Sequence, residues 1–323
     1  MTLSQIAKEA HVSVSTASKA FSGSNEVNEE TRELVFEIAK KHGCFKKFYN
    51  IKYPKLVIAI IAPEFSSMYY SRYLSLLQKN LPNCELCVST GKFSAECERD
   101  LIDYYYKHAS VDGIILIDPV SCIDFSIEIP IVVLHNTQTT KHKAVSAAVS
   151  ASFREAMNEA LRYLKSRDIT DIGFIGEDNT KSKECLFRET MNEIGIPINE
   201  SLVKRTAERF ENGGYQAVDA FIHENTIPRA IICAYDYMAI GAMKCLTDHG
   251  YKIPQDVAIL GMDDLPLAPY LNPPLASISS SPEMRCRLTA EAMLKAINGE
   301  ETKSPIIIQA QFHNRSSFQT DKK

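Results

Sequence analysis

The chain has 323 residues and a formal net charge of −4, with 45% hydrophobic and 24% charged residues. This balance is typical of a globular protein with two or three compact domains. The mild acidity indicates no polyanion partner for the molecule as a whole, so any affinity for nucleic acid must come from a local surface. No apolar run reaches about 18 residues, and the N-terminal segment lacks the apolar core of a signal peptide. We therefore expect a cytoplasmic protein without a membrane-spanning helix.

Nine cysteines are scattered along the chain. Cys84 and Cys87 have the spacing of a metal or redox motif, but no second pair of this kind follows, and the segment 84–89 has the pattern of a strand. We interpret the cysteines as small apolar side chains in a reducing compartment. The sequence therefore predicts no metal site and no cofactor.

Three helical patterns follow one another in the first fifty residues. Thr2 and Gln5 can form a capping box at the start of the first helix. Ser13 can cap a second helix that runs to about Phe21, and Asn28 can cap a third. Two short helices joined by a tight break and followed by a supporting third predict a helix-turn-helix. On the pattern alone, an ordinary helical hairpin remains the alternative.

The residues of these helices resemble the signature of the LacI/GalR family of transcriptional regulators. The matching positions are Leu3-x-Gln5-Ile6-Ala7-x-x-Ala10-x-Val12-Ser13-x-x-Thr16-Ala17-Ser18-Lys19. The third helix also resembles that family, through Val27-Asn28-Glu29-Glu30-Thr31-Arg32 and Ile38-Ala39-x-x-x-Gly43. Gln5 departs from the acid that is usual there, but glutamine also serves a capping box.

The resemblance implies that the second helix enters the major groove of DNA. Val14 and Ser15 occupy the positions that vary most with the operator, and Val14 would contact a thymine methyl group. Lys19 would reach the O6 and N7 atoms of a guanine. The expected phosphate contacts come from short hydroxyl side chains: Ser13, Thr16, Ser18 and Ser22. For Ser13, helix capping alone is an equally good role.

The segment 44–55 departs from the family. Members usually carry a hinge helix there, with Pro-Asn and Ala-Arg-x-Leu elements, whose leucine inserts into the minor groove. Here the segment is shorter and has four lysines interleaved with four aromatic residues, a composition suited to phosphates and the minor groove. We hypothesise that Phe48 or Ile51 replaces the leucine and that Lys46 and Lys47 contact DNA. A less ordered basic linker is the alternative.

From Leu56 onward, apolar strand patterns alternate with amphipathic helical patterns. The expected strands are Leu56–Ala62, Gly113–Ile117, Ile131–Leu134, Ile172–Ile175, Ala230–Ala234 and Val257–Gly261. The expected helices cover 72–81, 95–108, 152–165, 183–194, 213–223 and 237–249. Continuous apolar strands separated by helices predict parallel sheets covered on both faces. This pattern is compatible with one large sheet and with two smaller sheets.

The resemblance favours two lobes, because several segments match the periplasmic-binding-protein-like core of the family in order. They include 110–116, 129–133, 172–176, 236–242, 253–257, 261–264 and 273–275. The predicted fold is an all-α helix-turn-helix headpiece followed by an α/β sensor of two doubly wound parallel-sheet lobes. The expected domains are a headpiece over 1–43, a linker over 44–55 and an effector-binding domain over 56–323. Its first lobe would cover about 56–148 and 282–299, and its second about 149–281 and 300–323.

In open α/β sheets, ligands bind beyond the carboxyl ends of the strands. By that rule and by the resemblance, the predicted effector residues are Tyr69, Tyr70, Asp118, His135, Lys183, Tyr235, Asp236 and Asp263. Capping of the following helix is the competing role for Asp236, and an ordinary loop position is the competing role for His135. Lys183 and Tyr235 stand where the family mostly has arginine and asparagine, so the sequence leaves the identity of the ligand open.

The sequence thus predicts a homodimeric repressor that binds a pseudo-palindromic DNA operator and responds to a small ligand, with a sugar or sugar derivative as the expected class. A solute-binding module without DNA function is the alternative, but it would lack a helix-turn-helix. An enzyme is not expected, because the sequence has no GxSxG, GxxxxGK[ST] or HExxH motif and no GxGxxG after a strand.

Overall fold

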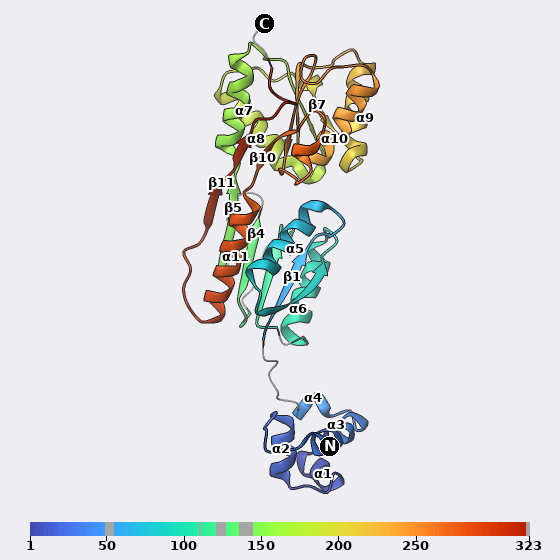
Figure 1. Cartoon of the computed structure of the whole chain (residues 1–323), viewed down its shortest axis with the longest axis vertical. Helices are drawn as coiled ribbons and strands as arrows, with labels where there is room; N and C mark the ends of the chain where they lie inside the picture. The colour runs from blue at the N-terminus through green and yellow to red at the C-terminus, as the bar shows by residue number, and fades with distance from the viewer. Residues whose placement is uncertain (49–54, 110, 121–126, 136–144, 321–323) are drawn as a thin grey trace. The chain divides into compact units, whose positions relative to one another are not determined.

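A computed structural model describes residues 1–48, 55–109, 111–120, 127–135 and 145–320 (Figure 1). The chain divides into two compact units, Met1–Leu56 and Val57–Lys323, which are described separately below. Among the described residues, no helix is both long and apolar enough to cross a membrane.

The first unit, the headpiece, is entirely helical, as the sequence predicts. Its helices are α1 (Leu3–Glu9), α2 (Val14–Phe21), α3 (Glu29–Lys41) and α4 (Phe45–Phe48). The Thr2–Gln5 capping box is present, and the side chains of Ser13 and Asn28 cap α2 and α3. Small alanines on α1 and α2 let these helices approach closely, and Ala17 has no exposed surface. The caps and the apolar faces together produce the expected helix-turn-helix.

The start of the predicted linker belongs to the headpiece, which corrects the boundary at Gly43. Cys44 is buried, and Phe45 and Phe48 of the one-turn helix α4 pack against the headpiece core. The ring of Phe21 lies 6.2 Å from the ring of Phe45 and 5.7 Å from that of Phe48. Aromatic packing at these distances holds α4 in place, although two consecutive lysines near its start oppose the helix dipole.

The first sheet of the second unit is parallel and has the strand order β11-β5-β4-β3-β1-β2. Its strands are β1 (Leu56–Ala62), β2 (Cys84–Thr90), β3 (Gly113–Ile117), β4 (Ile131–His135), β5 (Ala147–Ser152) and β11 (Ile306–Gln309). Helices α5 (Met68–Asn80) and α11 (Pro282–Ile297) cover one face, through buried Tyr73, Leu77 and Met293. Helix α6 (Ala95–Lys107) covers the other, through Ile102 and Tyr105.

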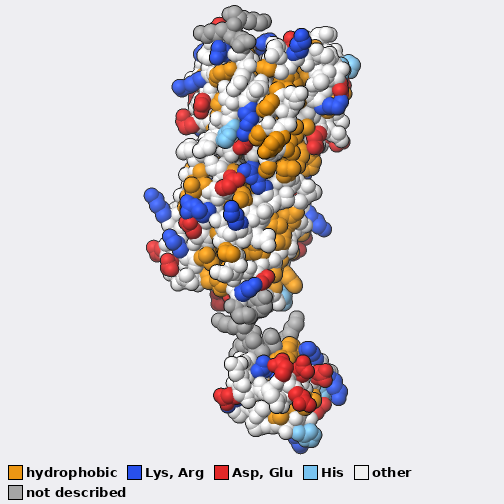
Figure 2. Space-filling model, viewed as in Figure 1, with side chains coloured by type: hydrophobic (Ala, Val, Ile, Leu, Met, Phe, Trp, Pro, Cys, Tyr) orange, Lys and Arg blue, Asp and Glu red, His pale blue; other side chains and the backbone are white. Residues whose placement is uncertain are grey.

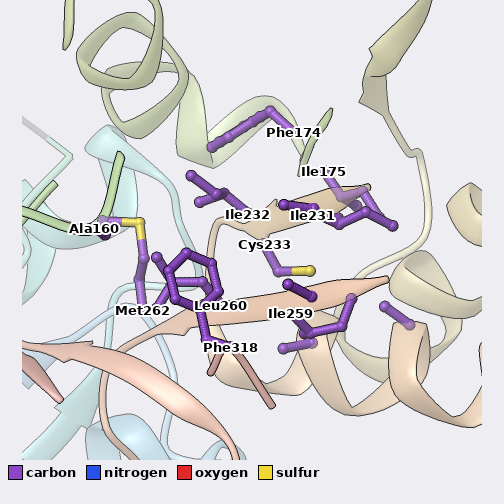
Figure 3. Packing of buried hydrophobic residues seen from close by; sticks show 14 of the residues in the cluster. Ala160, Phe174, Ile175, Ile231, Ile232, Cys233, Ile259, Leu260, Met262 and Phe318 are labelled. Atoms are coloured by element: carbon purple, nitrogen blue, oxygen red, sulfur yellow. The ribbon is translucent and has the colours of Figure 1, made fainter. Parts of the chain in front are cut away.

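The second sheet has the order β12-β10-β9-β8-β6-β7, and only its edge strand β12 is paired antiparallel. Its strands are β6 (Ile172–Gly176), β7 (Val203–Arg205), β8 (Ala230–Cys233), β9 (Ala258–Met262), β10 (Ala276–Ser279) and β12 (Gln311–His313). The helices of this lobe are α7 (Arg154–Ser166), α8 (Lys181–Glu193), α9 (Phe210–His223) and α10 (Asp236–Asp248). Figure 3 shows Phe174, Ile232, Leu260 and Phe318 within its apolar core. The two parallel-sheet lobes confirm the predicted fold class.

The chain passes between the lobes at positions that differ from those predicted. Strand β5 continues to Ser152 in the first sheet, beyond the predicted change at 148/149. Strand β11 also lies in the first sheet, although the prediction gave residues from 300 onward to the second lobe. The two strands pair with each other from Val149 and Ile306 onward. Strand β5 consists mostly of alanine and serine and carries a weak strand signal, whereas β11 begins with three isoleucines. Neither sequence indicates a lobe, so the pairing decides it.

Several elements also begin or end differently from the sequence pattern. Helix α5 begins at Met68 rather than at 72, because the hydroxyl of Ser67 caps it. The sequence analysis did not predict helix α11 or strands β5, β7, β10, β11 and β12.

On the face of the molecule in Figure 2, lysine, arginine, aspartate and glutamate side chains are interspersed over the second unit. This distribution fits the small net charge.

Candidate DNA-binding and effector sites

The exposed face of α2 carries the side chains predicted to read DNA. Ala17, Ala20 and Phe21 are buried on its inner face. The positions predicted to contact bases or phosphates lie on the remaining surface, which is formed by Val14, Ser15, Thr16, Ser18, Lys19 and Ser22. Val14 is 47% exposed, so its apolar side chain is available for contact. The helix therefore presents a short surface of one apolar, several hydroxyl and one cationic group.

Several side chains that are predicted to contact DNA have partners within the headpiece. The hydroxyl of Ser13 accepts a hydrogen bond from the backbone N–H of Thr16 at 2.9 Å, so the capping role is present. Lys19 forms an ion pair with Glu26, in which the side chains are 43% and 69% exposed. Exposed pairs contribute little to stability. DNA could therefore replace Glu26 as the partner of Lys19 at small cost.

The predicted minor-groove wedge is not supported at Phe48. The side chain is half-buried and packs against Phe21, with Lys47 5.4 Å from the centre of its ring. An inserted Phe48 would have to leave this aromatic cluster. Ile51 and the side chain of Lys46, which the sequence also assigns to DNA, lie outside the described residues.

A cavity of about 260 Å³ lies between the two lobes of the second unit. Seven of the eight predicted effector residues line it. They lie at strand ends or in the loops and first helical turns that follow strands of both sheets: Tyr69, Tyr70, Asp118, His135, Lys183, Tyr235 and Asp263. Ligand sites typically have volumes of about 300–1,000 Å³. The cavity therefore fits a small ligand.

Lys183 and Asp263 form a buried ion pair on the second-lobe side of the cavity. The Nζ atom of Lys183 lies 3.2 Å from Oδ1 of Asp263 and donates a hydrogen bond to the carbonyl of Ala234 at 2.6 Å. The two side chains are 9% and 8% exposed. Burial raises the pKa of Asp263 to about 6, although the charge of Lys183 opposes this shift. The pair offers both a hydrogen-bond donor and an acceptor to a polar ligand.

Asp118 occupies the first-lobe side of the cavity, at the end of β3. Its carboxylate accepts a hydrogen bond from the hydroxyl of Tyr69 at 3.1 Å, and its Oδ1 lies 3.7 Å from Nδ1 of His135. Arg285 on α11 is fully buried and donates hydrogen bonds to the carbonyl of His135 at 2.5 Å and to the hydroxyl of Tyr73 at 2.7 Å. Arg285 thus positions the strand end that carries His135, a role that the sequence analysis missed.

A second polar cluster in the cavity was also missed. The guanidinium of Arg209 lies 3.2 Å from Glu177 of its own lobe and 3.2 Å from Glu64 of the opposite lobe. It also stacks on Phe93, with 4.8 Å between its Cζ atom and the centre of the ring. Tyr235 joins this cluster, because its hydroxyl donates to Glu177 at 3.3 Å. Sequence spacing could not indicate this group, since Glu64 and Arg209 are separated by 145 residues.

The structure corrects the prediction for Asp236, which does not line the cavity. Its side chain is fully buried, accepts hydrogen bonds from the N–H of Leu265 at 2.7 Å and from the hydroxyl of Ser277 at 2.5 Å, and so ties α10 to the ends of β9 and β10. Burial, followed by the nearby charge of Asp263, raises the pKa of Asp236 to about 7. Its role is to support the loop that presents Asp263.

The backbone at the cavity is strained at two acidic residues. Asp118 has a φ of 43° and Asp263 a φ of 141°, in a region that side chains other than glycine seldom adopt. Such conformations cost about 1–3 kcal/mol each and are concentrated at functional sites. These two residues supply one cavity carboxylate from each lobe.

Two family models match the chain. Residues 2–44 match the model described as "Bacterial regulatory proteins, lacI family", and residues 161–318 match "Periplasmic binding protein-like domain". The helix-turn-helix and the two-lobed α/β unit define a DNA-binding transcriptional regulator with a ligand-sensing domain. The chain thus carries a helix-turn-helix of the LacI family and a periplasmic-binding-protein-like domain, as its resemblance in sequence predicts.

Curated relatives resemble the chain over most of its length. The ribose operon repressor of Haemophilus influenzae is 26% identical, with 95% of this chain and 96% of that protein covered. The transcriptional regulator AscG of Escherichia coli is 27% identical, with 86% of both chains covered. These relatives are transcriptional regulators rather than enzymes, in agreement with the prediction.

Solved structures share the fold. The lac repressor dimer bound to operator and an anti-inducer has a TM-score of 0.72 at 17% identity, and covers 99% of both chains. The regulator CelR in complex with cellobiose has a TM-score of 0.69 at 22% identity, with 98% of this chain and 99% of that chain covered. A regulator from Alkaliphilus metalliredigens in complex with D-xylulofuranose has a TM-score of 0.68 at 19% identity, over 82% of this chain.

Proposed function

We propose that the protein is a cytoplasmic repressor whose affinity for its operator is set by a small polyhydroxylated ligand bound between the two lobes. One observation carries the proposal: a small cavity is lined from both lobes by aromatic rings and by hydrogen-bonded carboxylates and cations. A ligand that contacts both lobes binds the closed arrangement better than an open one, and so shifts the population between them.

The polar groups of the cavity favour neutral, hydroxyl-rich ligands. Lys183 pairs with Asp263, and Arg209 pairs with Glu64 and Glu177, so the cations have acidic partners. Carboxylates accept hydrogen bonds from sugar hydroxyls, and the Tyr69 ring offers an apolar face for a sugar ring. Similar proteins support the same class, since one is a ribose operon repressor and two solved structures hold cellobiose or D-xylulofuranose. The cavity volume favours a ligand of one ring.

For the headpiece, we infer that two copies of α2 bind the two halves of a pseudo-palindromic operator, as two-fold symmetry requires. The lac repressor, which shares the fold, is solved as a dimer bound to its operator. Val14 and Ser15 would read base edges, Lys19 a guanine, and the hydroxyls of Ser13, Thr16, Ser18 and Ser22 the phosphates.

The test combines ligand binding and DNA binding. The full chain is screened by thermal shift against pentoses, hexoses, their phosphates and nucleobases. A ligand at about 100 times its Kd should add roughly 2.7 kcal/mol of stability to the protein. The Asp263→Asn variant should lose this shift, whereas Asp256→Asn, an exposed carboxylate outside the cavity, should keep it.

The effect on DNA is then measured by fluorescence anisotropy with DNA from upstream of the gene, with and without the ligand. The proposal predicts salt-dependent binding that the ligand changes by about tenfold or more, a coupling of typical size. A ligand that stabilises wild-type and Asp263→Asn protein equally would reject the cavity as its site. Failure to bind any upstream DNA at low salt would reject the repressor function.

A further inference from the structure

The second lobe has a cluster of aspartate, cysteine and histidine side chains at the C-terminal ends of α9 and α10. Side chains of these types commonly bind metal ions. Asp219 and His223 are one turn apart on α9, and Cys245 and His249 are one turn apart at the end of α10. One ligand atom each from Asp219, Cys245 and His249 lies within 4.8 Å of the other two. None of these residues lines the effector cavity, and the lining residues that α9 and α10 do contribute, Phe210 and Tyr237, lie at the N-terminal ends of these helices.

Close packing of the two helices produces the cluster. A Cβ atom added to Gly214 would lie 1.9 Å from the carbonyl oxygen of Met238, and one added to Gly241 would lie 1.8 Å from that of Glu211. Only glycine allows the backbones to approach this closely. The helices lie next to each other in the second lobe (Figure 1), so that side chains one turn before the C-terminus of each helix share one space.

The ring of His249 is held between the two helices. Its Nδ1 atom lies 2.9 Å from the carbonyl oxygen of Cys245, and its Nε2 atom lies 3.7 Å from Oδ1 of Asp219. Metal-binding histidines commonly donate one ring N–H to a backbone carbonyl, which fixes the tautomer and leaves the other nitrogen with its lone pair. Nε2 of His223 lies 3.5 Å from the other oxygen of the same carboxylate. The Asp219 carboxylate thus has an imidazole on each side.

The thiol of Cys245 completes the donor set. Its Sγ atom lies 3.7 Å from Nδ1 of His249, and the residue has no exposed surface. Burial, followed by the charges of Asp219 and Asp248, raises the pKa of this thiol to about 11. Without a cation the sulfur therefore stays protonated, and binding of a metal ion would displace its proton to solvent.

The surroundings favour a cation over an anion. Helices α9 and α10 both end at the cluster, and a helix C-terminus carries partial negative charge. The neighbouring carboxylate of Asp248 already has partners, because it lies 2.7 Å from Nζ of Lys244 and 3.2 Å from the hydroxyl of Tyr215. Asp219 is the carboxylate that faces both imidazoles.

We propose that Asp219, Cys245 and His249 bind a zinc-class divalent transition metal ion, with His223 as the fourth ligand. One sulfur, two imidazole nitrogens and one carboxylate oxygen suit zinc, whereas magnesium and calcium prefer sites made of oxygen alone. Bond lengths of about 2.0–2.3 Å in a tetrahedron place ligand atoms about 3.5 Å apart. Metal binding therefore requires side-chain rotations that bring the ligand atoms closer together, and it requires the imidazole of His223, whose side chain is 76% exposed, to turn inward.

The test uses cobalt(II) and zinc(II) as probes on the full-length protein, purified without a histidine tag and with a non-thiol reductant. Cobalt(II) should give a near-ultraviolet thiolate-to-metal charge-transfer band and the visible bands of a tetrahedral ion, and zinc(II) should abolish both. Cys245→Ser should remove the charge-transfer band. Asp219→Asn should weaken binding by at least about tenfold, as loss of a group at a metal site typically does. Cys185→Ser, at an exposed cysteine on α8, should bind as the wild type does.

Three results would overturn the proposal: no thiolate band with cobalt(II), a band that survives in Cys245→Ser, or equal weakening in Cys185→Ser. If the Cys245 variant does not fold, the Asp219→Asn variant still tests the site, because Asp219 is partly exposed and its replacement should not prevent folding. A metal affinity equal to that of the wild type in Asp219→Asn would reject the site. Effector binding is not used as a readout, so the outcome is independent of the proposed repressor function.

Discussion

Lys183 and Asp263 are separated by 80 residues in the sequence, yet Nζ of the lysine lies 3.2 Å from Oδ1 of the aspartate beside the effector cavity. The pair joins the start of α8 to the end of β9, and it lies where the resemblance to the LacI family predicts effector contacts. We expect the pair to contribute both to the stability of the second lobe and to ligand binding.

Replacement of Lys183 by methionine should destabilise the second unit, because it leaves Asp263 buried without its cation. The free energy of unfolding should fall by about 2–3 kcal/mol. This loss is somewhat below the usual cost of breaking a buried ion pair, because Asp263 can take up a proton and lose its charge. Urea unfolding at pH 7.5 measures the change. Lys181→Met, at a lysine whose side chain is 60% exposed, is the matched control. Equal stability of the two variants would show that the ion pair contributes nothing.

The raised pKa of Asp236 predicts a pH-dependent stability. The folded group has a pKa of about 7 and the unfolded group one near 3.8, so between these values the folded chain holds a proton that the unfolded chain has lost. The contribution of Asp236 is therefore greatest at low pH and disappears as the pH rises through 7. Between pH 5 and 8, the free energy of unfolding should fall by about 2–3 kcal/mol more in wild type than in Asp236→Asn. Parallel pH profiles would contradict this assignment.

The ion pair between Arg209 and Glu64 links the two lobes at the cavity. Because the pair is partly exposed, its contribution to the closed arrangement should be about 1 kcal/mol. Glu64→Gln should therefore weaken effector binding by about fivefold, as measured by calorimetry with the ligand found in the screen. Glu189→Gln removes an ion pair within the second lobe and should leave the affinity unchanged. Tighter binding by Glu64→Gln would show that the pair opposes closure.

Lys19 and Glu26 should have opposite effects on DNA binding. Lys19→Gln removes the cation that we expect to reach a guanine, and should weaken operator binding by about 1–2 kcal/mol. Glu26→Gln removes the competing partner of Lys19. DNA binding should become stronger, because Lys19 no longer has to give up an ion pair when it contacts DNA. Anisotropy titrations at several salt concentrations measure both effects. Weaker binding by Glu26→Gln would mean that the ion pair orients Lys19 for DNA.

Phe48→Ala should act on the stability of the headpiece rather than on the bending of DNA. The side chain is half-buried against Phe21, so its loss should cost about 1–2 kcal/mol, less than for a fully buried aromatic residue. Phe48→Leu keeps an apolar contact and should recover part of the loss. Thermal unfolding of the headpiece and an operator-bending assay decide between the roles. Unchanged stability together with reduced bending would restore the minor-groove hypothesis.

The sequence by itself determined the features that depend on residues close together in the chain. Thr2, Ser13 and Asn28 cap helices because each hydroxyl or amide reaches a backbone N–H three residues further on. The continuous apolar strands likewise predict covered parallel sheets, and strand ends predict a ligand site, so seven of the eight effector candidates line the cavity.

Tertiary structure decided the features that depend on contacts between distant residues. The pairing of β5 with β11 decides the lobe to which β5 belongs. Glu64 and Arg209 are 145 residues apart in the sequence, and they form an ion pair only because the two lobes come together at the cavity. Asp236 follows a strand just as Asp263 does, yet hydrogen bonds to Leu265 and Ser277 turn its carboxylate away from the cavity. Such contacts leave no local periodicity in the chain, because packing brings the partners together only after the sheets have formed.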